Sequence, residues 1–404
     1  MDIIKIPVEN LEEGMIIRGI DKKWLKLPFF NKPLNNIPKH IEILKKYGIQ
    51  YVFVDNNKKM GINSKILNKN IEKIDPQIKA TIDKKEILQL KRIKELHVEH
   101  KEILKKIFLD VRAGKSLDSP PLKKVVKTYI DYYFRKPELL MNIIRLKDFN
   151  RYIYIHSLNV CILSIIVGSR IGFDVENLNC LGLGGLLHDI GKMKIPESIL
   201  NKKGKLTEKE EELLKKHPIY SYEILKDSLD ISLDTKKCVL QHHECIDGTG
   251  YPLRLTDKNI TKLAKIVSIV NFYDYLTSTT SNKEALIPPQ AIKKIIDVAG
   301  TKLDKLYVHF FIDTLGIYPV GTLVLLDSGE LAVVFQINRR DITRPLVLII
   351  TDTNKNMIPP YPFKLDSYNL VTKKPYKSIK KALENSDYNL DTNKLIDNFI
   401  ATCL

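Results

Sequence analysis

Cysteine is scarce in this sequence of 404 residues, and its placement excludes one class of protein. The five cysteines are odd in number and widely spaced, with no CxxC pair among them. Disulfide-stapled folds and cysteine-based zinc modules depend on paired cysteines. The sequence therefore predicts reduced thiols, and we expect a cytoplasmic protein.

Long apolar runs and phosphate-binding loops are also missing. No run approaches the roughly eighteen apolar residues that a membrane-spanning helix needs, and the start MDIIKIPVENLEEGM does not resemble a secretory signal. There is no GxxxxGK[ST] motif. The glycines Gly182, Gly184 and Gly185 lie in an apolar stretch, and we interpret them as sites of close helix packing rather than of dinucleotide binding.

The balance of charge is strongly basic. Lysine and arginine number 65 against 48 acidic residues, which gives a formal net charge of +17. The lysines are scattered rather than massed with aromatic residues, so we attribute them to compositional bias and expect no nucleic-acid polymer as partner. The charge would still help to attract a small anionic ligand.

Apolar periodicity predicts a mainly α protein with two small units that contain β-structure. Residues 1–57 read as a small α/β domain, with strands at 3–8, 15–20 and 50–55 and a helix at 37–47. We predict a polar linker at residues 58–82, a long connecting helix at 83–118 and a helical domain at 119–315. A short antiparallel β extension follows at 316–352, and a polar tail at 353–404.

Histidines and aspartates gather in the predicted helical domain. A single histidine on a helix is usually a core or surface residue, but an unpaired carboxylate in an apolar helix costs several kcal/mol. A divalent cation is a natural partner for such groups, because neutral imidazole and carboxylate bind iron, manganese and zinc. The candidate metal ligands are His156, His188, Asp189, His217, His242, His243 and Asp274.

These ligand types in this number indicate a particular chemistry. A carboxylate can bridge two cations a few Å apart. Two such cations can activate one water at neutral pH and place it in line with a phosphorus atom. The sequence therefore favours metal-dependent hydrolysis of a phosphoester.

The pattern H…HDIGK…HP…HHECIDGTGYP…D resembles the HD-GYP phosphodiesterases, a branch of the HD superfamily. The resemblance is strong over residues 150–310 and extends weakly to both ends. It implies a helical catalytic domain that uses a metal-bridging hydroxide to hydrolyse cyclic di-GMP to linear pGpG, and sometimes on to GMP. It also implies a binuclear or trinuclear centre, with iron or manganese as the expected metals.

The resemblance assigns roles by position. His156, His188, Asp189 and Asp274 would hold one ion. Asp189 would bridge to a second ion held by the remaining three histidines. Lys192 would contact the scissile phosphate, and with Asp189 it forms the expected catalytic pair. The expected substrate-binding residues are Lys192, Asp247, Gly250, Tyr251, Pro252 and Lys283. Residues 247–252 (DGTGYP) form the GYP loop of this family. Protein partners could dock on this loop, at Tyr251, or on the N-terminal domain.

Three positions depart from the family pattern. Tyr152 replaces a glutamate that trinuclear members carry one turn before the first histidine, and a neutral phenol is a poor ligand, so we expect two ions. Tyr275 replaces the alanine of the usual Asp-Ala-Leu. The basic Arg-Pro-Tyr-Arg run is reduced to Lys283.

These departures leave two alternatives open. The protein could hydrolyse another cyclic dinucleotide, such as cyclic GMP-AMP, or it could be a non-catalytic receptor for one. A pure receptor would not need seven intact ligands, which argues against the second. The sequence does not fix the oligomeric state, for which a homodimer is one option.

Overall fold

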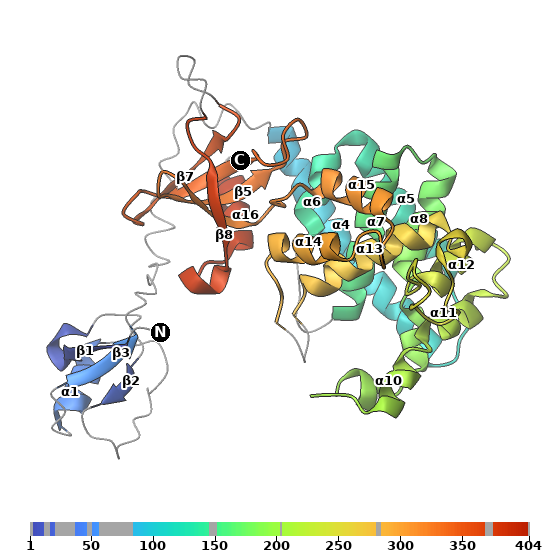
Figure 1. Cartoon of the computed structure of the whole chain (residues 1–404), viewed down its shortest axis with the longest axis horizontal. Coiled ribbons are helices and arrows are strands. Elements are labelled where there is room, and N and C mark those ends of the chain that lie inside the picture. Colours follow the sequence, from blue (N-terminus) through green and yellow to red (C-terminus); the bar gives the residue numbers. More distant parts are fainter. Residues whose placement is uncertain are drawn as a thin grey trace.

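Three groups of elements follow one another along the chain: a small α/β unit, an array of helices and a C-terminal sheet (Figure 1). The computed structural model describes residues 3–11, 17–20, 37–46, 51–55, 84–144, 152–202, 204–279, 284–367 and 375–402. Helices dominate these residues, so the predicted mainly α fold class is confirmed.

The N-terminal unit is a three-stranded antiparallel sheet with one helix. β1 (Ile3–Pro7) and β2 (Ile17–Ile20) both pair with the central strand β3 (Tyr51–Asp55), and α1 (Ile37–Lys46) precedes β3. Val8, Leu44 and Val52 are fully buried in this unit. The predicted strands and helix are therefore confirmed, whereas the expected linker at 58–82 lies outside the described residues.

The helical region begins with the long α4 (Lys84–Arg112), which agrees with the predicted connecting helix. Caps fix several of the later helices: Asp174 caps α8, and Thr207 forms a capping box with Glu210 at α10. The remaining elements are α5 (Ser119–Arg135), α6 (Pro137–Ile144), α7 (Tyr152–Ile171), α8 (Val175–Leu187), η3 (Ile190–Lys194), α9 (Glu197–Leu200), α10 (Glu208–Leu214), α11 (His217–Leu225), α12 (Leu233–Gln241), η4 (Asp257–Asn259), α13 (Lys262–Leu276), α14 (Pro288–Asp297) and α15 (Lys305–Leu315).

Helices α7 and α8 form the centre of the array. In the part of the chain that the structure describes, the segment Ile153–Ile171 of α7 is the one helix long and apolar enough to cross a membrane, but 78% of its most apolar window is buried. A Cβ on Gly185 of α8 would lie 3.0 Å from the carbonyl oxygen of Val160 on α7. This contact confirms that the glycines of α8 permit close helix packing, and α7 is a core helix.

The C-terminal sheet is antiparallel with the strand order β7-β6-β5-β4-β8. Its strands are β4 (Leu323–Leu326), β5 (Leu331–Gln336), β6 (Leu346–Thr351), β7 (Met357–Lys364) and β8 (Ile379–Leu383), followed by η5 (Asn385–Tyr388) and α16 (Thr392–Thr402). The predicted β extension is confirmed by β4, β5 and β6. However, residues 353–404 are not a simple tail, because they supply β7, β8 and α16.

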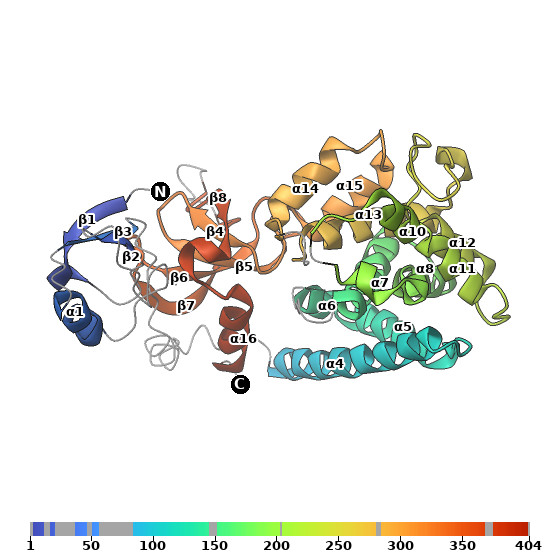
Figure 2. The same ribbon diagram turned by 90° about the horizontal axis from the view of Figure 1, so that it is seen from below.

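The helices and the sheet share one apolar core. Leu323, Val333 and Ile350 of the sheet belong to the same buried cluster as the side chains of α4 to α15, and Phe399 of α16 joins them. Figure 2 shows α4 along one side of the helices with α16 near its start, where Lys94 and Asp397 form an ion pair of 2.6 Å.

Candidate metal centre

The seven predicted ligands converge from separate helices, mostly at helix ends. His156 lies on α7 and Asp274 on α13, whereas His188 directly follows α8 and Asp189 precedes η3. His217 is the first residue of α11. His242 and His243 directly follow α12. Two groups of donor atoms come close enough to share an ion: His156, His188 and Asp189, and Asp189, His217, His242 and His243.

A close crossing of η3 and α11 sets this geometry. A Cβ on Gly191 would lie 2.1 Å from the carbonyl oxygen of His217, so only glycine fits there. The backbone N–H of Gly191 donates to the hydroxyl of Ser221 (2.8 Å), and that hydroxyl donates to the carbonyl of His188 (2.9 Å). Ser221 thus ties the two ligand-bearing segments together, and no motif in the sequence signalled it.

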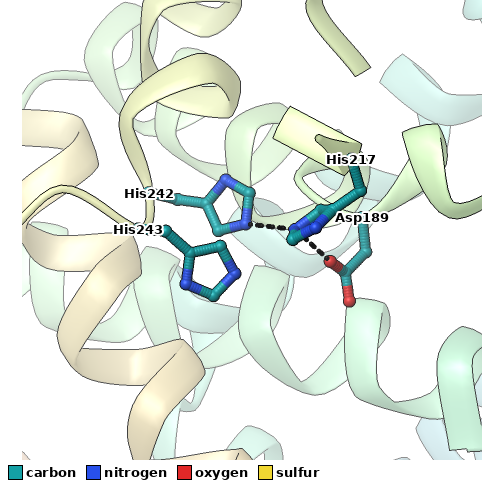
Figure 3. A group of neighbouring side chains, drawn as sticks. All are labelled: Asp189, His217, His242 and His243. Atoms are coloured by element: carbon teal, nitrogen blue, oxygen red, sulfur yellow. Dashed lines mark hydrogen bonds and ion pairs between the residues drawn. The ribbon is translucent and has the colours of Figure 1, made fainter. Parts of the chain in front are cut away.

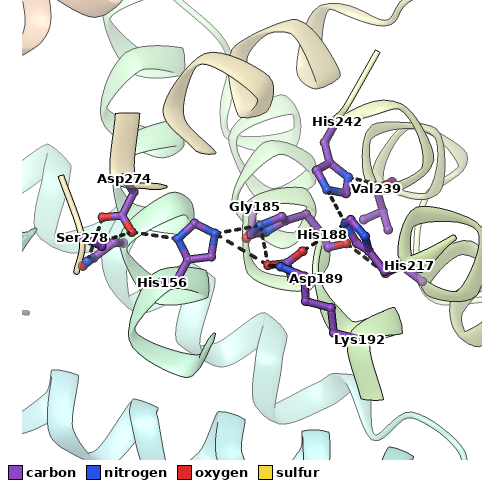
Figure 4. A network of polar contacts seen from close by, with 12 residues as sticks. His156, Gly185, His188, Asp189, Lys192, His217, Val239, His242, Asp274 and Ser278 are labelled. Carbon is purple, nitrogen blue, oxygen red and sulfur yellow. Dashed lines mark hydrogen bonds and ion pairs between the residues drawn. The ribbon is translucent and has the colours of Figure 1, made fainter. Parts of the chain in front are cut away.

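The carboxylate of Asp189 faces both groups. Its Oδ2 lies 3.4 Å from Nε2 of His188 and 3.7 Å from Nε2 of His156, while Oδ1 lies 3.2 Å from Nε2 of His217 (Figures 3 and 4). The side chain is 1% exposed. One oxygen toward each group is the arrangement that a bridging carboxylate requires.

Hydrogen bonds at Nδ1 fix the tautomers of four histidines. His188, His217 and His242 each place Nδ1 within 2.7 to 2.8 Å of a backbone carbonyl, of Gly185, Leu214 and Val239 respectively. A carbonyl only accepts, so each Nδ1 carries the proton and donates it. Nδ1 of His156 likewise donates to Oδ2 of Asp274 (2.7 Å). In the neutral form, all four rings therefore present an unprotonated Nε2.

These unprotonated nitrogens face one another. The Nε2 atoms of His156 and His188 are 3.2 Å apart, as are those of His217 and His242. Burial lowers the pKa of His156, His217, His242 and His243, which keeps these rings neutral near pH 7.

Two lone pairs in contact repel each other, and the buried Oδ1 of Asp189 receives no hydrogen bond either. A cation beside these atoms would remove the repulsion between the lone pairs and would give Oδ1 of Asp189 a partner. Histidines that bind a metal typically donate their other ring N–H to a carbonyl or carboxylate, as these do. The residues therefore fit divalent metal ions.

The electrostatics of Asp189 keep it ionised. Burial alone would raise its pKa, but neighbouring His188 and Lys192 lower that pKa well below its usual range. The ammonium group of Lys192 donates to Oδ2 of Asp189 at 2.6 Å and is partly exposed. Lys192 thus lies at the rim of the centre, beside the predicted bridging ligand.

Asp274 lies behind His156. Its Oδ2 accepts from His156, while Oδ1 accepts from the amide of Asn159 (3.2 Å) and Ser278 lies 3.4 Å from Oδ2 (Figure 4). Asp274 is outside the two groups whose donor atoms lie together. The structure thus gives it a role in orienting His156, and its role as a direct ligand stays a prediction.

The GYP loop packs against the histidine pair. The ring of Tyr251 stacks on His243 with centroids 4.6 Å apart and 17° between the planes. Asp247 is exposed and accepts from the backbone and hydroxyl of Thr249, so it shapes the loop. A Cβ on Gly250 would lie 2.3 Å from the backbone nitrogen of Cys245, and Tyr251–Pro252 is a cis peptide. Lys283 and the side chain of Tyr152 lie outside the described residues.

Comparisons with known proteins give matches to two domain families and to several single proteins. A sequence profile of the HD domain matches residues 138–306, and one of a domain of unknown function (DUF3391) matches residues 3–121. The chain is 34% identical over 128 residues to the 3'3'-cGAMP-specific phosphodiesterase 2 of Vibrio cholerae, a match that covers 31% of this chain and 24% of that protein. Among solved structures, it aligns with Bd1817, a HDG"Y"P protein from Bdellovibrio bacteriovorus, at 22% identity and a TM-score of 0.49, covering 78% of this chain and 99% of that one.

One relative matches this chain over most of its length and identifies the family. The cyclic di-GMP phosphodiesterase PA4108 of Pseudomonas aeruginosa is 31% identical over 350 residues, which cover 85% of this chain and 84% of that protein. The HD-domain match contains every predicted metal ligand. With its HD signature and GYP loop in place, the chain belongs to the family of HD-GYP cyclic di-GMP phosphodiesterases.

Proposed function

We propose that this chain hydrolyses cyclic di-GMP to linear pGpG at the centre around Asp189. The observation that carries the proposal is the convergence of unprotonated histidine Nε2 atoms on a buried carboxylate. The similarity to PA4108 over 85% of the chain supports the substrate.

The proposed centre would hold two ions. His156 and His188 would hold the first together with Oδ2 of Asp189, and Asp274 would complete or orient this set. His217, His242 and His243 would hold the second with Oδ1 of Asp189. Mixed imidazole and carboxylate ligands suit iron or manganese. Tyr152 supplies no anionic side chain for a third ion.

When bound, such ions supply Lewis acidity and lower the pKa of coordinated water. The chain's own residues supply orientation and charge. The carbonyls of Gly185, Leu214 and Val239 hold three histidine rings so that each Nε2 points into the centre. The ammonium of Lys192 is placed to contact the scissile phosphate and to stabilise the charge that develops on its oxygens.

The substrate would lie over the GYP loop. Tyr251 is stacked on His243, and burial raises the pKa of its phenol, so the ring stays neutral beside the anionic substrate. Lys283 would contact a phosphate. Tyr275, next to Asp274, is 45% exposed and enlarges the side chain at a position where the family usually has alanine.

A second substrate is favoured by one finding. The 3'3'-cGAMP-specific enzyme of Vibrio cholerae is 34% identical to this chain over 128 residues. Tyr275 and the shortened basic run are the positions at which this chain could select between bases. Cyclic GMP-AMP is therefore the alternative substrate.

The test is turnover of both dinucleotides by the purified protein. Protein loaded with manganese or ferrous iron under exclusion of oxygen is incubated with cyclic di-GMP or cyclic GMP-AMP, and the products are separated by chromatography. Asp189→Asn should abolish turnover and lower the metal content. His309→Ala is the matched control, since His309 lies on α15 outside the ligand groups.

Each outcome is decisive for one claim. Linear pGpG from cyclic di-GMP supports the proposal, and faster cleavage of cyclic GMP-AMP favours the alternative. Binding of either dinucleotide without cleavage, in protein with full metal content, would contradict an enzymatic role.

Cytoplasmic localisation and a homodimer remain predictions. Cell fractionation tests the first, and sedimentation tests the second.

A further inference from the structure

Glu244 directly follows the metal-ligand pair but does not face the metal groups. It is 3% exposed, and its carboxylate accepts two backbone hydrogen bonds, from Leu253 (2.6 Å) and Leu255 (2.8 Å). Its donor atoms belong to neither group that could share an ion. A buried carboxylate that accepts two N–H groups is a strong local clamp.

The clamp closes the GYP loop over the histidine pair. The backbone N–H of Tyr251 donates to the carbonyl of His243 (3.2 Å), so the end of the loop is hydrogen-bonded to the residue that precedes Glu244. Between the two clamped N–H groups, Arg254 has a φ of 54°. A left-handed conformation is unfavourable for arginine, and it persists only where the surroundings enforce it. Glu244 supplies that enforcement.

Both ends of the loop are anchored separately. Lys265 donates to Asp257 and to Asp304 (3.0 Å), and the N–H of Ile246 donates to the carbonyl of Lys302. These contacts hold the loop to α13 and α15. Within the segment 251–255, Glu244 holds the backbone N–H groups of Leu253 and Leu255.

We propose that Glu244 is a positioning residue that fixes the ring plane of His243 by holding Tyr251 stacked upon it. The chain of contacts runs from the carboxylate to the N–H groups of Leu253 and Leu255, then to Tyr251, then to the imidazole. This inference rests on the proposed metal centre. Residues that orient a metal ligand typically change metal affinity or activity by about 10- to 100-fold when replaced.

The test is metal binding without substrate, so it does not depend on which phosphodiester is cleaved. Manganese is titrated into metal-free protein by calorimetry, and His243→Ala identifies the binding step that involves His243. Glu244→Gln keeps the size but loses one acceptor, because an amide NH2 then faces a backbone N–H. We expect that step to weaken about 10- to 100-fold, and the other step to stay within about twofold.

A double-mutant cycle tests the route through Tyr251. Tyr251→Phe keeps the stacked ring and should bind manganese as the unaltered protein does. Tyr251→Ala should weaken manganese binding as much as Glu244→Gln does. The double variant should bind manganese no more weakly than either single variant. Glu330→Gln is the matched control, because Glu330 is a similarly buried glutamate (8% exposed) in the turn between β4 and β5.

Unaltered manganese binding in Glu244→Gln would overturn the inference, as would fully additive losses in the double variant. Circular dichroism of each variant shows whether it is folded. If Glu244→Gln does not fold, Tyr251→Ala against Tyr251→Phe still decides whether the stacked ring positions His243. Failure to hydrolyse cyclic di-GMP with normal manganese binding would count against the proposed function alone.

Discussion

Two buried histidines outside the candidate ligand groups should make the protein sensitive to acid. His97 and His100 lie one turn apart on α4 and are 3% and 5% exposed. Nδ1 of His97 is 3.1 Å from the hydroxyl of Tyr129, and the ring of His100 meets that of Tyr129 edge-on at 5.0 Å. Nε2 of His97 and Nδ1 of His100 have no hydrogen-bond partner.

Their surroundings oppose protonation. Burial lowers the pKa of both histidines to about 4. His100 and Lys101 further lower the pKa of His97, and Lys124 lowers that of His100. In the unfolded chain, the pKa of each would be about 6.5. Between these values, the unfolded state binds a proton that the folded state does not, so the free energy of unfolding falls as the pH falls.

The magnitude follows from the linkage relation. Each histidine removes about 1.4 kcal/mol per pH unit, or about 3 kcal/mol between pH 6.5 and pH 4. Such a loss is a large part of the roughly 5 to 15 kcal/mol that stabilises most proteins. The stabilising contribution is complete above pH 6.5.

Urea unfolding of the metal-free protein at a series of pH values provides the assay. His97→Gln retains a hydrogen-bonding group for Tyr129 but does not titrate, so it should lose about 3 kcal/mol less than the unaltered protein between pH 7 and pH 4. His309→Gln is the control, since His309 is exposed. Equal pH dependence in His97→Gln and the unaltered protein would refute the reasoning.

Three further changes have defined outcomes. Lys192→Gln should lower kcat about 100-fold through lost charge stabilisation while metal content stays normal; an unchanged kcat would remove Lys192 from the chemistry. Gly191→Ala should destabilise the protein by about 3 kcal/mol in urea unfolding, since its Cβ would lie 2.1 Å from the carbonyl of His217. Gly114→Ala is the comparison: its Cβ would meet no atom within 4 Å, so its φ of +82° adds only the backbone strain, which should cost less. A chain that begins near residue 80 should still hydrolyse substrate, and complete loss in folded, metal-loaded protein would contradict a purely regulatory N-terminal unit.

The residues that the structure brings together at the candidate site could be named from the sequence because they match the motif of a known family. Two adjacent pairs, His188-Asp189 after the apolar α8 and His242-His243 after α12, are the central part of that motif. The residues that orient the ligands could not be found this way. Ser221 contacts backbone atoms of Gly191 and His188, about 30 residues earlier in the chain, and a lone serine carries no signal of such partners. Glu244 lies in the motif, but the motif does not reveal that its carboxylate binds the backbone of Leu253 and Leu255.

The fold was predictable where periodicity was strong. Helix α4 and strands β4, β5 and β6 have clear apolar patterns. Strand β7, in contrast, contains Pro359, Pro360 and Pro362, which argue against a central strand, and it indeed lies at the edge of the sheet. Strand β8 reads IKKAL and is too short and polar to be recognised without its partner β4.

The shared apolar core determines which parts of the protein unfold together. Side chains of β4, β5, β6 and α16 are packed into the same cluster as the metal-bearing helices. Regions that share one core tend to open as a single cooperative unit. Ending the chain after α15 would leave the helices with an uncovered apolar surface, so the C-terminal sheet is as much a part of the catalytic fold as the helices that carry the ligands.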